Sequence, residues 1–427
     1  MIALATDSNH EVNHVHMDPR LLICENKMED FEAVKAAAYE CSRGVRWKQA
    51  TIDYLNNINF RVATTIDHIK KEGYQPTCYN TFVITDPKVR KINSATLSDR
   101  IIQKTMCDHT LYHELTHYLN VNNAACQIGR GTIYATRRIK RHMYHFVRLN
   151  GTDGWVIRID VKKFFDNISH GYIKAVIARR VHNFAYQNSL YGQIDSFKIP
   201  QILEPHRAEA AGIPLGSQLS QLYALNALDV IDDYVQRYLH IEHYIRYMDD
   251  IVIIVDGSYE DAVLISKLVI GRIECLGYEV NVSKTSIQPL SNGITFLHQH
   301  HHVTKTGRVI TTIERSKFKA ERRKLKRMFY DLHFKSRKNI TLAIILRHYQ
   351  GWRTGVILKS GNENTVRDMD WLFMKYMHRR SSKFIIGPTE LEGLNKDFIR
   401  KFCSSCMKTN TTNDLFTTGP MRSHDHR

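Results

Sequence analysis

Long apolar runs are absent from this 427-residue sequence. A transmembrane helix needs about 20 mostly apolar residues, whereas the longest uninterrupted apolar segments, such as Ile251–Val255, have only the length of a strand. The N-terminal residues MIALATDSNH also lack the basic start of a secretory signal, and their apolar run is short. We therefore expect a soluble, cytoplasmic protein with no membrane partner.

Cysteine is sparse as well, with eight residues scattered along the chain. Disulfide frameworks have dense, evenly spaced cysteines, so this pattern indicates free thiols in a reducing cytosol. One pair, Cys403 and Cys406, has the spacing of a zinc site, with His424 and His426 as the nearest partners. A complete Cys2His2 site is an open alternative, but we favour free thiols because the intervening residues resemble a loose tail.

Acidic residues are in deficit, because 43 Asp and Glu stand against 60 Lys and Arg, which gives a formal net charge of +17. A surplus of this size favours a polyanionic partner, and nucleic acid is the most common one. Two predicted helices, Thr136–Arg148 and Arg315–Lys338, are especially basic, and the alternative for each is an ordinary solvated face. The residues that we expect to contact phosphates are Arg137, Arg138, Lys140, Arg141, Arg322, Arg323 and Lys326.

The sequence has neither internal repeats nor low-complexity tracts. Its apolar spacing predicts helices up to about residue 52, then short strands mixed with helices, and helices again from Arg315. Ser98 is a candidate N-cap for the helix that follows the first pair of strands. This order of elements predicts an α+β fold with a separate helical C-terminal region.

Three aspartates are expected where predicted strands end. Asp249 and Asp250 lie in the tight turn between the segments YIRYMDD and IVIIV, and Asp160 ends the alternating segment VIRID. Adjacent carboxylates repel one another unless a cation lies between them, although most such pairs form only a polar turn. A third carboxylate at another strand end favours a site for two Mg²⁺ ions about 3.5–4 Å apart, as in-line nucleotidyl transfer requires.

These residues belong to a series of motifs that resembles the reverse transcriptases. The YxDD motif of that family corresponds to Tyr247–Asp250, and PKVR, RIDVKKFFDNISH, GIPLGSQLSQ, LGYEVNVSKT and GITFLHQ stand around it in the family's order. The resemblance covers Tyr79 to about Thr312 and extends more weakly to Arg380. It implies that the metal ligands are Asp160, Val161, Asp249 and Asp250.

The resemblance also implies a right-hand polymerase fold with fingers, palm and a helical C-terminal thumb. It predicts a helical N-terminal extension at 1–52, fingers at 53–153, a palm with inserted fingers elements at 154–312, a thumb at 313–380 and a tail at 381–427. Helices of the thumb around Gln350–Phe373 would then clamp the primer–template duplex.

Basic residues are assigned to the substrate by the same resemblance. Lys88 and Arg90 correspond to the cations of the fingers that hold the incoming triphosphate, a role that suits a point charge and a guanidinium fork. Lys284 corresponds to the palm lysine that protonates the departing pyrophosphate. The alternatives are a charged surface hairpin for the first two residues and an ordinary exposed lysine for the third.

Phe165 corresponds to the steric gate of the family, where a bulky ring leaves no room for a ribose 2′-hydroxyl, so dNTPs are the expected substrates. A core aromatic beside Phe164 is the alternative. Gly216 and Gln218 lie in a loop expected to pack against the template and the incoming base pair. This loop, PLGSQLSQ at Pro214–Gln221, departs from the common PQGxxxSP motif and resembles diversity-generating enzymes and stand-alone enzymes of phage defence.

Histidine motifs suggest zinc, but we favour no zinc. HELTH at His113–His117 matches the HExxH pattern of zinc proteases, yet no third ligand follows at the required spacing, and we interpret it as a packed helix. Strand alternation would divide the histidines of GITFLHQHHH between the two faces of a hairpin. These histidines are His298, which replaces the family's usual Gly, His300, His301 and His302.

We therefore predict an RNA-directed DNA polymerase that uses two Mg²⁺ ions and dNTPs. Its template would be a noncoding RNA encoded nearby, its product a cDNA, and its role antiphage defence. Alternatives are an enzyme of a diversity-generating retroelement, a template-independent or protein-primed DNA polymerase of the abortive-infection type, and an RNA-binding scaffold without catalysis. The sequence specifies no oligomeric state.

Overall fold

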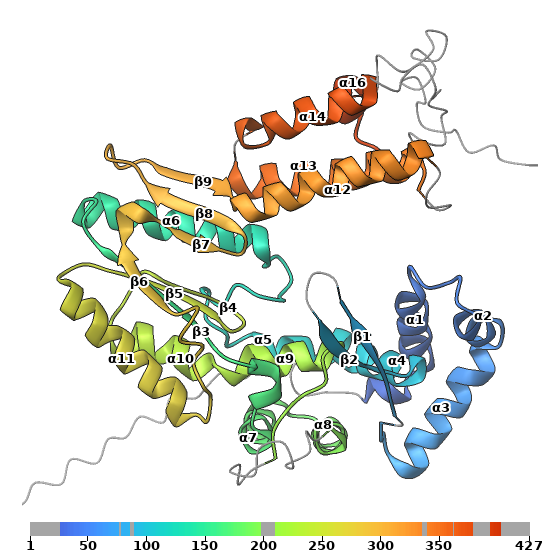
Figure 1. Ribbon diagram of the computed structural model, residues 1–427. Coiled ribbons are helices and arrows are strands. Elements are labelled where there is room, and N and C mark those ends of the chain that lie inside the picture. The colour runs from blue at the N-terminus through green and yellow to red at the C-terminus, as the bar shows by residue number, and fades with distance from the viewer. Residues whose placement is uncertain are drawn as a thin grey trace, which may run out of the picture. The chain divides into compact units, whose positions relative to one another are not determined.

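The computed structural model describes residues 26–76, 78–85, 89–197, 210–334, 340–361, 363–378 and 393–402. Helices and short antiparallel sheets alternate along the chain (Figure 1), which confirms the predicted α+β fold. The chain forms two compact units. The first holds the residues up to Leu119 and Lys163–Asp229, and the second holds Asn120–Lys162 and the residues from Val230 onward. The division into fingers, palm and thumb stays a prediction.

The first unit is mainly helical, with one antiparallel hairpin formed by β1 (Tyr79–Ile84) and β2 (Arg90–Ala95). The next helix, α4 (Leu97–Met106), has its N-cap at Thr96, whose hydroxyl accepts a hydrogen bond from the backbone N–H of Asp99. The predicted N-cap at Ser98 is therefore wrong. The other elements are η2 (Lys27–Glu29), α1 (Phe31–Ser42), α2 (Gln49–Asn56), α3 (Ile58–Glu72), η3 (Cys107–Leu111), α5 (Tyr112–Thr116), η4 (Phe164–Asn167), α7 (His170–Arg180), α8 (Phe184–Ser196) and α9 (Gln218–Ala227).

The second unit is built on a four-stranded antiparallel sheet with the strand order β4-β5-β3-β6. Its strands are β3 (Trp155–Asp160), β4 (Tyr244–Tyr247), β5 (Asp250–Val255) and β6 (Ser286–Pro289). Every residue of the segment IVIIV in β5 is buried, which explains why this segment is continuously apolar instead of alternating.

Helices cover both faces of this sheet. On one face, α6 (Thr132–Asn150) contributes Ile139 and Phe146 to a buried cluster that includes Val156 of β3. On the opposite side, α11 (Tyr259–Cys275) packs against β3 (Figure 1). The short helices of this region are α10 (Asp229–Asp233), η6 (Tyr234–Tyr238) and η7 (Leu290–Asn292).

A three-stranded sheet and a group of helices complete the second unit. The strands are β7 (Ile294–Phe296), β8 (Gln299–Val303) and β9 (Val309–Ile313). The helices are α12 (Arg315–Phe334), α13 (Leu342–Ser360), η8 (Glu363–Val366), α14 (Arg367–His378) and α16 (Lys396–Phe402). The start of α12 agrees with the predicted change to helical structure at Arg315.

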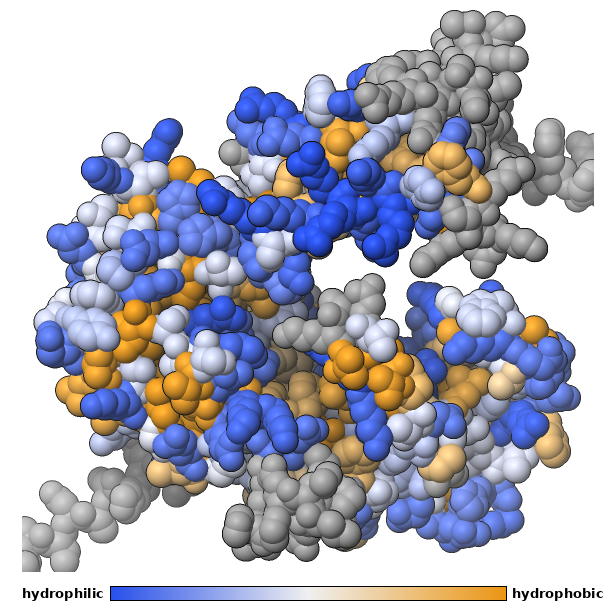
Figure 2. Space-filling model, viewed as in Figure 1, coloured by the Kyte–Doolittle hydropathy of each residue, from blue (hydrophilic) through white to orange (hydrophobic). Residues whose placement is uncertain are grey.

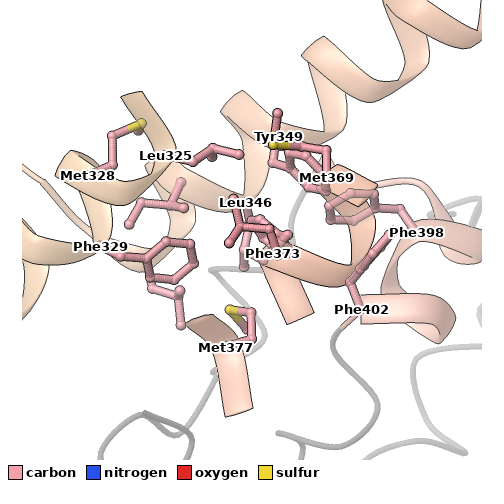
Figure 3. Close-up of a cluster of buried hydrophobic side chains, with 13 residues drawn as sticks. Leu325, Met328, Phe329, Leu346, Tyr349, Met369, Phe373, Met377, Phe398 and Phe402 are labelled. Atoms are coloured by element: carbon pink, nitrogen blue, oxygen red, sulfur yellow. The ribbon is translucent and has the colours of Figure 1, made fainter. Parts of the chain in front are cut away.

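Aliphatic, methionine and aromatic side chains together form the core that these C-terminal helices share (Figure 3). Tyr349 of α13 stacks on Phe373 of α14, with ring centroids 4.0 Å apart. The hydroxyl of Tyr349 donates a hydrogen bond to Asp370 at 2.6 Å, so the polar end of this buried ring is satisfied. None of the helices in the described part of the chain has the length and apolar character that crossing a bilayer requires.

Candidate active site

The three predicted aspartates meet at one end of the four-stranded sheet. Asp160 is the last residue of β3 and pairs in register with Asp250, the first residue of β5. The connection from β4 to β5 is a two-residue turn of Met248 and Asp249. The backbone N–H of Val161 donates to the carbonyl of Asp249 at 3.2 Å, which ties the end of β3 to this turn.

The surroundings of Asp249 and Asp250 destabilise the ionised form of their carboxylates. Burial is the main cause that raises the pKa of Asp249 to about 6, and the negative charges of Asp160 and Asp250 add to it. Burial also raises the pKa of Asp250, against the opposing effect of the Arg158 guanidinium. A divalent cation would relieve both effects, and carboxylate oxygens are the ligands that Mg²⁺ prefers. The residues present therefore fit a magnesium site.

Two basic side chains contact the carboxylates directly. Arg158 of β3 donates from Nε and Nη2 to the two carboxylate oxygens of Asp250, at 2.9 and 2.8 Å. Lys284 donates from Nζ to Oδ1 of Asp160 at 2.7 Å, and its side chain is 46% exposed. Lys284 thus lies beside the predicted aspartates. The sequence-based prediction omits Arg158, although the alternation of VIRID puts it on the same face of β3 as Asp160.

A buried ion pair supports the strand that leads into the turn. Arg246 of β4 is fully buried and donates from Nη2 to Oδ2 of Asp232 at 2.6 Å. The hydroxyl of Tyr244 donates to the same carboxylate. The prediction from sequence omits this pair too. An arginine inside an otherwise apolar strand is the signal that indicates it, because arginine is almost never fully buried unless it is paired.

The residues predicted to contact the nucleotide belong to the first unit. Arg90 is exposed at the start of β2, and Lys88 lies outside the described residues. Gly216 and Gln218 are exposed, and the preceding Leu215 accepts a hydrogen bond from the β2 backbone at 3.0 Å. The φ of Gly216 is 118°, a backbone conformation that residues with a side chain rarely adopt, so the loop requires glycine there.

Phe164 and Phe165 take different positions. Phe164 is 3% exposed and belongs to the core, whereas Phe165 is partly exposed. Their rings form an edge-to-face contact with centroids 5.7 Å apart. Phe164 is thus the inward-facing residue of the pair, and the role of Phe165 as steric gate stays a prediction.

The predicted phosphate contacts on α12 lie on its exposed side. Arg322, Arg323 and Lys326 are all exposed, while Leu325 and Phe329 face the core of the C-terminal helices. Figure 2 shows hydrophilic side chains gathered over this helix. The basic face of α12 is therefore accessible to a polyanion.

The predicted contacts on α6 are divided. Arg137 and Arg141 are exposed one helical turn apart. Arg138 instead donates to the side chain of Asn122 at 2.6 Å, and Lys140 donates to a backbone carbonyl of α13 at 3.4 Å. Only the first two of these side chains point freely to solvent, so α12 offers the larger basic surface.

The HELTH segment is packed as a helix. Leu115 is buried, and the carboxylate of Glu114 accepts from the backbone N–H of His182 at 3.2 Å. Burial raises the pKa of Glu114. The rings of His113 and His117 stack with centroids 5.0 Å apart. Within the residues that the structure covers, no third metal-ligating side chain joins these two histidines, and the absence of a zinc site at HELTH stays a prediction.

The histidines of β8 alternate as predicted. His301 is fully buried, whereas His300 and His302 are partly exposed and stack on each other with ring centroids 5.6 Å apart. The three rings therefore do not point to one metal. Cys403 and Cys406 lie outside the described residues, so it stays a prediction that their thiols are free and bind no zinc.

Comparison with known proteins gives a family match across most of this region. A family model described as reverse transcriptase (RNA-dependent DNA polymerase) matches residues 69–328. The chain is also similar to Protein YkfC of Escherichia coli (strain K12), with 25% identity over 292 residues, covering 59% of this chain and 74% of that protein.

Solved telomerase structures from two yeasts are also similar to the chain. Apo telomerase from Candida tropicalis, truncated from the C-terminal domain, has a TM-score of 0.40 and 14% identity, covering 57% of this chain and 58% of that one. The chain thus spans less than two thirds of that protein. Telomerase from Candida albicans in complex with a fragment of telomeric RNA has a TM-score of 0.42 and 11% identity. The match covers 86% of this chain and 71% of that one.

Proposed function

Because the chain belongs to the reverse transcriptase (RNA-dependent DNA polymerase) family, we propose that it copies a noncoding RNA encoded near its own gene into cDNA. The observation that carries this proposal is the register of Asp160 opposite Asp250, with Asp249 in the adjoining turn. Three carboxylates at one sheet edge suit nucleotidyl transfer, in which a 3′-oxygen attacks the α-phosphorus of a dNTP and pyrophosphate leaves.

Asp160, Asp249 and Asp250 would hold two magnesium ions, with Val161 contributing its backbone carbonyl. When bound, the metal ions supply positive charge to the attacking and leaving oxygens. The raised pKa of Asp249 supports this assignment, because a buried carboxylate among like charges is stabilised by a cation. Arg158 would keep Asp250 oriented through its two hydrogen bonds.

Lys284 is proposed to give a proton to the departing pyrophosphate. Its Nζ lies 2.7 Å from Asp160, so the side chain reaches the carboxylates while its stem is partly solvated. Arg90, together with Lys88, would hold the triphosphate of the incoming nucleotide, and Phe165 would exclude the ribose 2′-hydroxyl. Gly216 and Gln218 would border the template base pair.

The exposed basic face of α12 is proposed to follow the phosphates of the primer–template duplex. Arg322, Arg323 and Lys326 have the charge for this role, and their neighbours Leu325 and Phe329 anchor the helix in the core. Arg137 and Arg141 on α6 would add contacts, whereas Arg138 and Lys140 would act less directly because they already bond within the protein. In this proposal α12 belongs to the thumb.

Antiphage defence is the biological setting that we propose. The support is the loop PLGSQLSQ, which resembles the stand-alone enzymes of phage defence. Diversity-generating enzymes share this form of the loop, so they are the second candidate. The two settings differ in the product, because the second would yield cDNA that belongs to a variable target gene.

The experiment is to purify the protein from its native locus and to sequence the RNA and DNA bound to it. We expect cDNA complementary to one RNA encoded nearby, and no cDNA from the double variant Asp249→Ala/Asp250→Ala. Asp153→Ala, which removes an exposed carboxylate before β3, is the matched control and should behave as the unmodified protein. DNA that matches no RNA would instead indicate template-independent synthesis. If the double variant yielded as much DNA as the unmodified protein, the assignment of these aspartates to a polymerase site would be wrong.

A further inference from the structure

A side chain of α6 meets two adjacent residues that precede β4, at the end of the four-stranded sheet opposite the Met248–Asp249 turn. His145 lies in the last part of α6, and Glu242 and His243 directly precede β4. Their potential ligand atoms all lie within 4.8 Å of one another. His145 Nδ1 is 3.5 Å from Glu242 Oε1, and the rings of His145 and His243 have centroids 5.5 Å apart. Both elements belong to the second unit.

His243 carries a polar atom without a partner. Its side chain is 7% exposed, and its Nδ1 is buried with no hydrogen-bond partner. Its backbone carbonyl accepts from Ile254 N at 2.8 Å, and its ring packs edge-to-face against Phe146 with centroids 5.5 Å apart. Buried polar atoms in native proteins are nearly always satisfied, so an orphan nitrogen beside a histidine and a glutamate suggests a ligand.

The electrostatic surroundings favour a cation here. Burial lowers the pKa of His243, which favours the neutral imidazole, the form whose lone pair can coordinate a metal ion. The carboxylates of Glu242 and Asp256 provide negative charge close to the ring. The neighbouring His142 is engaged elsewhere, because its Nε2 lies 3.0 Å from the side-chain oxygen of Asn122.

We propose that His145, Glu242 and His243 bind a divalent cation of the zinc class. Two imidazole nitrogens and one carboxylate oxygen form a donor set that zinc accepts, whereas Mg²⁺ prefers oxygen ligands alone. Water would take the fourth position. The bound ion joins α6 to the start of β4, the strand that leads into the Met248–Asp249 turn, and so stabilises the sheet without touching the substrate.

The test is metal binding by the untagged full-length protein after treatment with a chelator. Zinc chloride is titrated calorimetrically with excess Mg²⁺ present, so that the carboxylates of the polymerase site do not compete. The Co²⁺-substituted protein is examined for the visible absorption of a nitrogen-ligated site. We expect zinc binding in the unmodified chain and a rise of its thermal unfolding midpoint with zinc.

Glu242→Gln and His145→Gln are the test variants, and each should weaken zinc binding by about tenfold or more. Their side chains are 68% and 44% exposed, so neither substitution is expected to prevent folding, which circular dichroism checks. The matched control is His68→Gln. His68 Nδ1 lies 3.6 Å from Glu72, a similar pair for which the described part of the chain provides no third ligand, and its loss should leave zinc binding unchanged.

Two outcomes would overturn the proposal. One is a wild-type protein that binds no zinc under these conditions. The other is zinc binding that Glu242→Gln and His145→Gln leave intact, which would mean that the ion sits elsewhere, for example at Cys403 and Cys406. The polymerase assignment is unaffected by either result, because the readout is binding and not DNA synthesis.

Discussion

Arg246 donates a hydrogen bond from its buried Nη1 to the carbonyl oxygen of Met248, at a distance of 3.1 Å. Met248 precedes Asp249 and has a left-handed backbone with φ of 56°, which is uncommon for a residue other than glycine. Since Arg246 is also paired with Asp232, one guanidinium links the turn to the body of the second unit. The position of the aspartates thus depends on a residue that does not face them.

Replacing Arg246 should destabilise the protein strongly. Arg246→Ala leaves Asp232, which is 1% exposed, without its cationic partner, and we expect the free energy of unfolding to fall by about 3–5 kcal/mol. Chemical denaturation measures this change. The control is Arg237→Ala, which removes an exposed partner of Asp233 and should cost about 0–1 kcal/mol. Similar losses in both variants would contradict a structural role for the buried pair.

Substitutions in the two adjacent phenylalanines should have different effects. Phe165→Val opens the proposed gate, so we expect the preference for dNTPs over rNTPs to fall by roughly 10- to 200-fold in single-nucleotide extension assays. Phe164→Leu alters a core residue that is 3% exposed and should instead lower stability by about 1–3 kcal/mol while nucleotide preference is kept. If Phe165→Val leaves the preference unchanged, Phe165 is not the gate.

Charge removal on α12 should change the salt dependence of duplex binding. In the triple variant Arg322→Gln/Arg323→Gln/Lys326→Gln, the slope of log affinity against log salt should become shallower by about 0.9 for each phosphate that is no longer neutralised. Fluorescence anisotropy with a labelled RNA–DNA duplex measures the slope. A variant with the same charge change on α3, Arg61→Gln/Lys70→Gln/Lys71→Gln, should keep the original slope. Equal slopes in both variants would exclude α12 as a specific binding surface for the duplex.

His301 should make folding sensitive to acid. Burial is the main cause that lowers the pKa of His301 to about 3, from an ordinary value of 6.5. Between these pH values the unfolded chain binds a proton at His301 that the folded chain does not. The contribution of the neutral His301 to the free energy of unfolding is therefore fully present above pH 6.5 and is lost as the pH falls toward 3.

Because of His301, we expect the free energy of unfolding to fall by up to about 1.4 kcal/mol for each pH unit in that range. His301→Gln should flatten the dependence of the free energy of unfolding on pH, measured by urea denaturation from pH 7 down to about pH 4. His109→Gln, an exposed histidine, should keep the original dependence. An unchanged slope in His301→Gln would show that His301 does not titrate in this way.

Local patterns predict much of the fold and of the candidate site. The apolar segment IVIIV and the alternating VIRID become neighbouring strands, and the histidines of β8 divide between two faces as their spacing requires. The meeting of Asp160, Asp249 and Asp250 could be predicted, because strand ends and a tight turn can be recognised from short stretches of sequence. The N-cap at Thr96 instead of Ser98 shows the limit of such patterns, since several small polar residues precede the helix.

The sequence by itself therefore determined the α+β character, the tight turn at Asp249 that leads into the strand beginning at Asp250, and the basic character of α12. Tertiary structure alone decided that Arg246 pairs with Asp232, that Arg158 holds Asp250, and that His145 meets Glu242 and His243. The physical reason is that periodicity and capping are local properties. Contacts between distant segments depend instead on how the sheet and its helices pack, and burial then sets the partner and the charge state of each polar group.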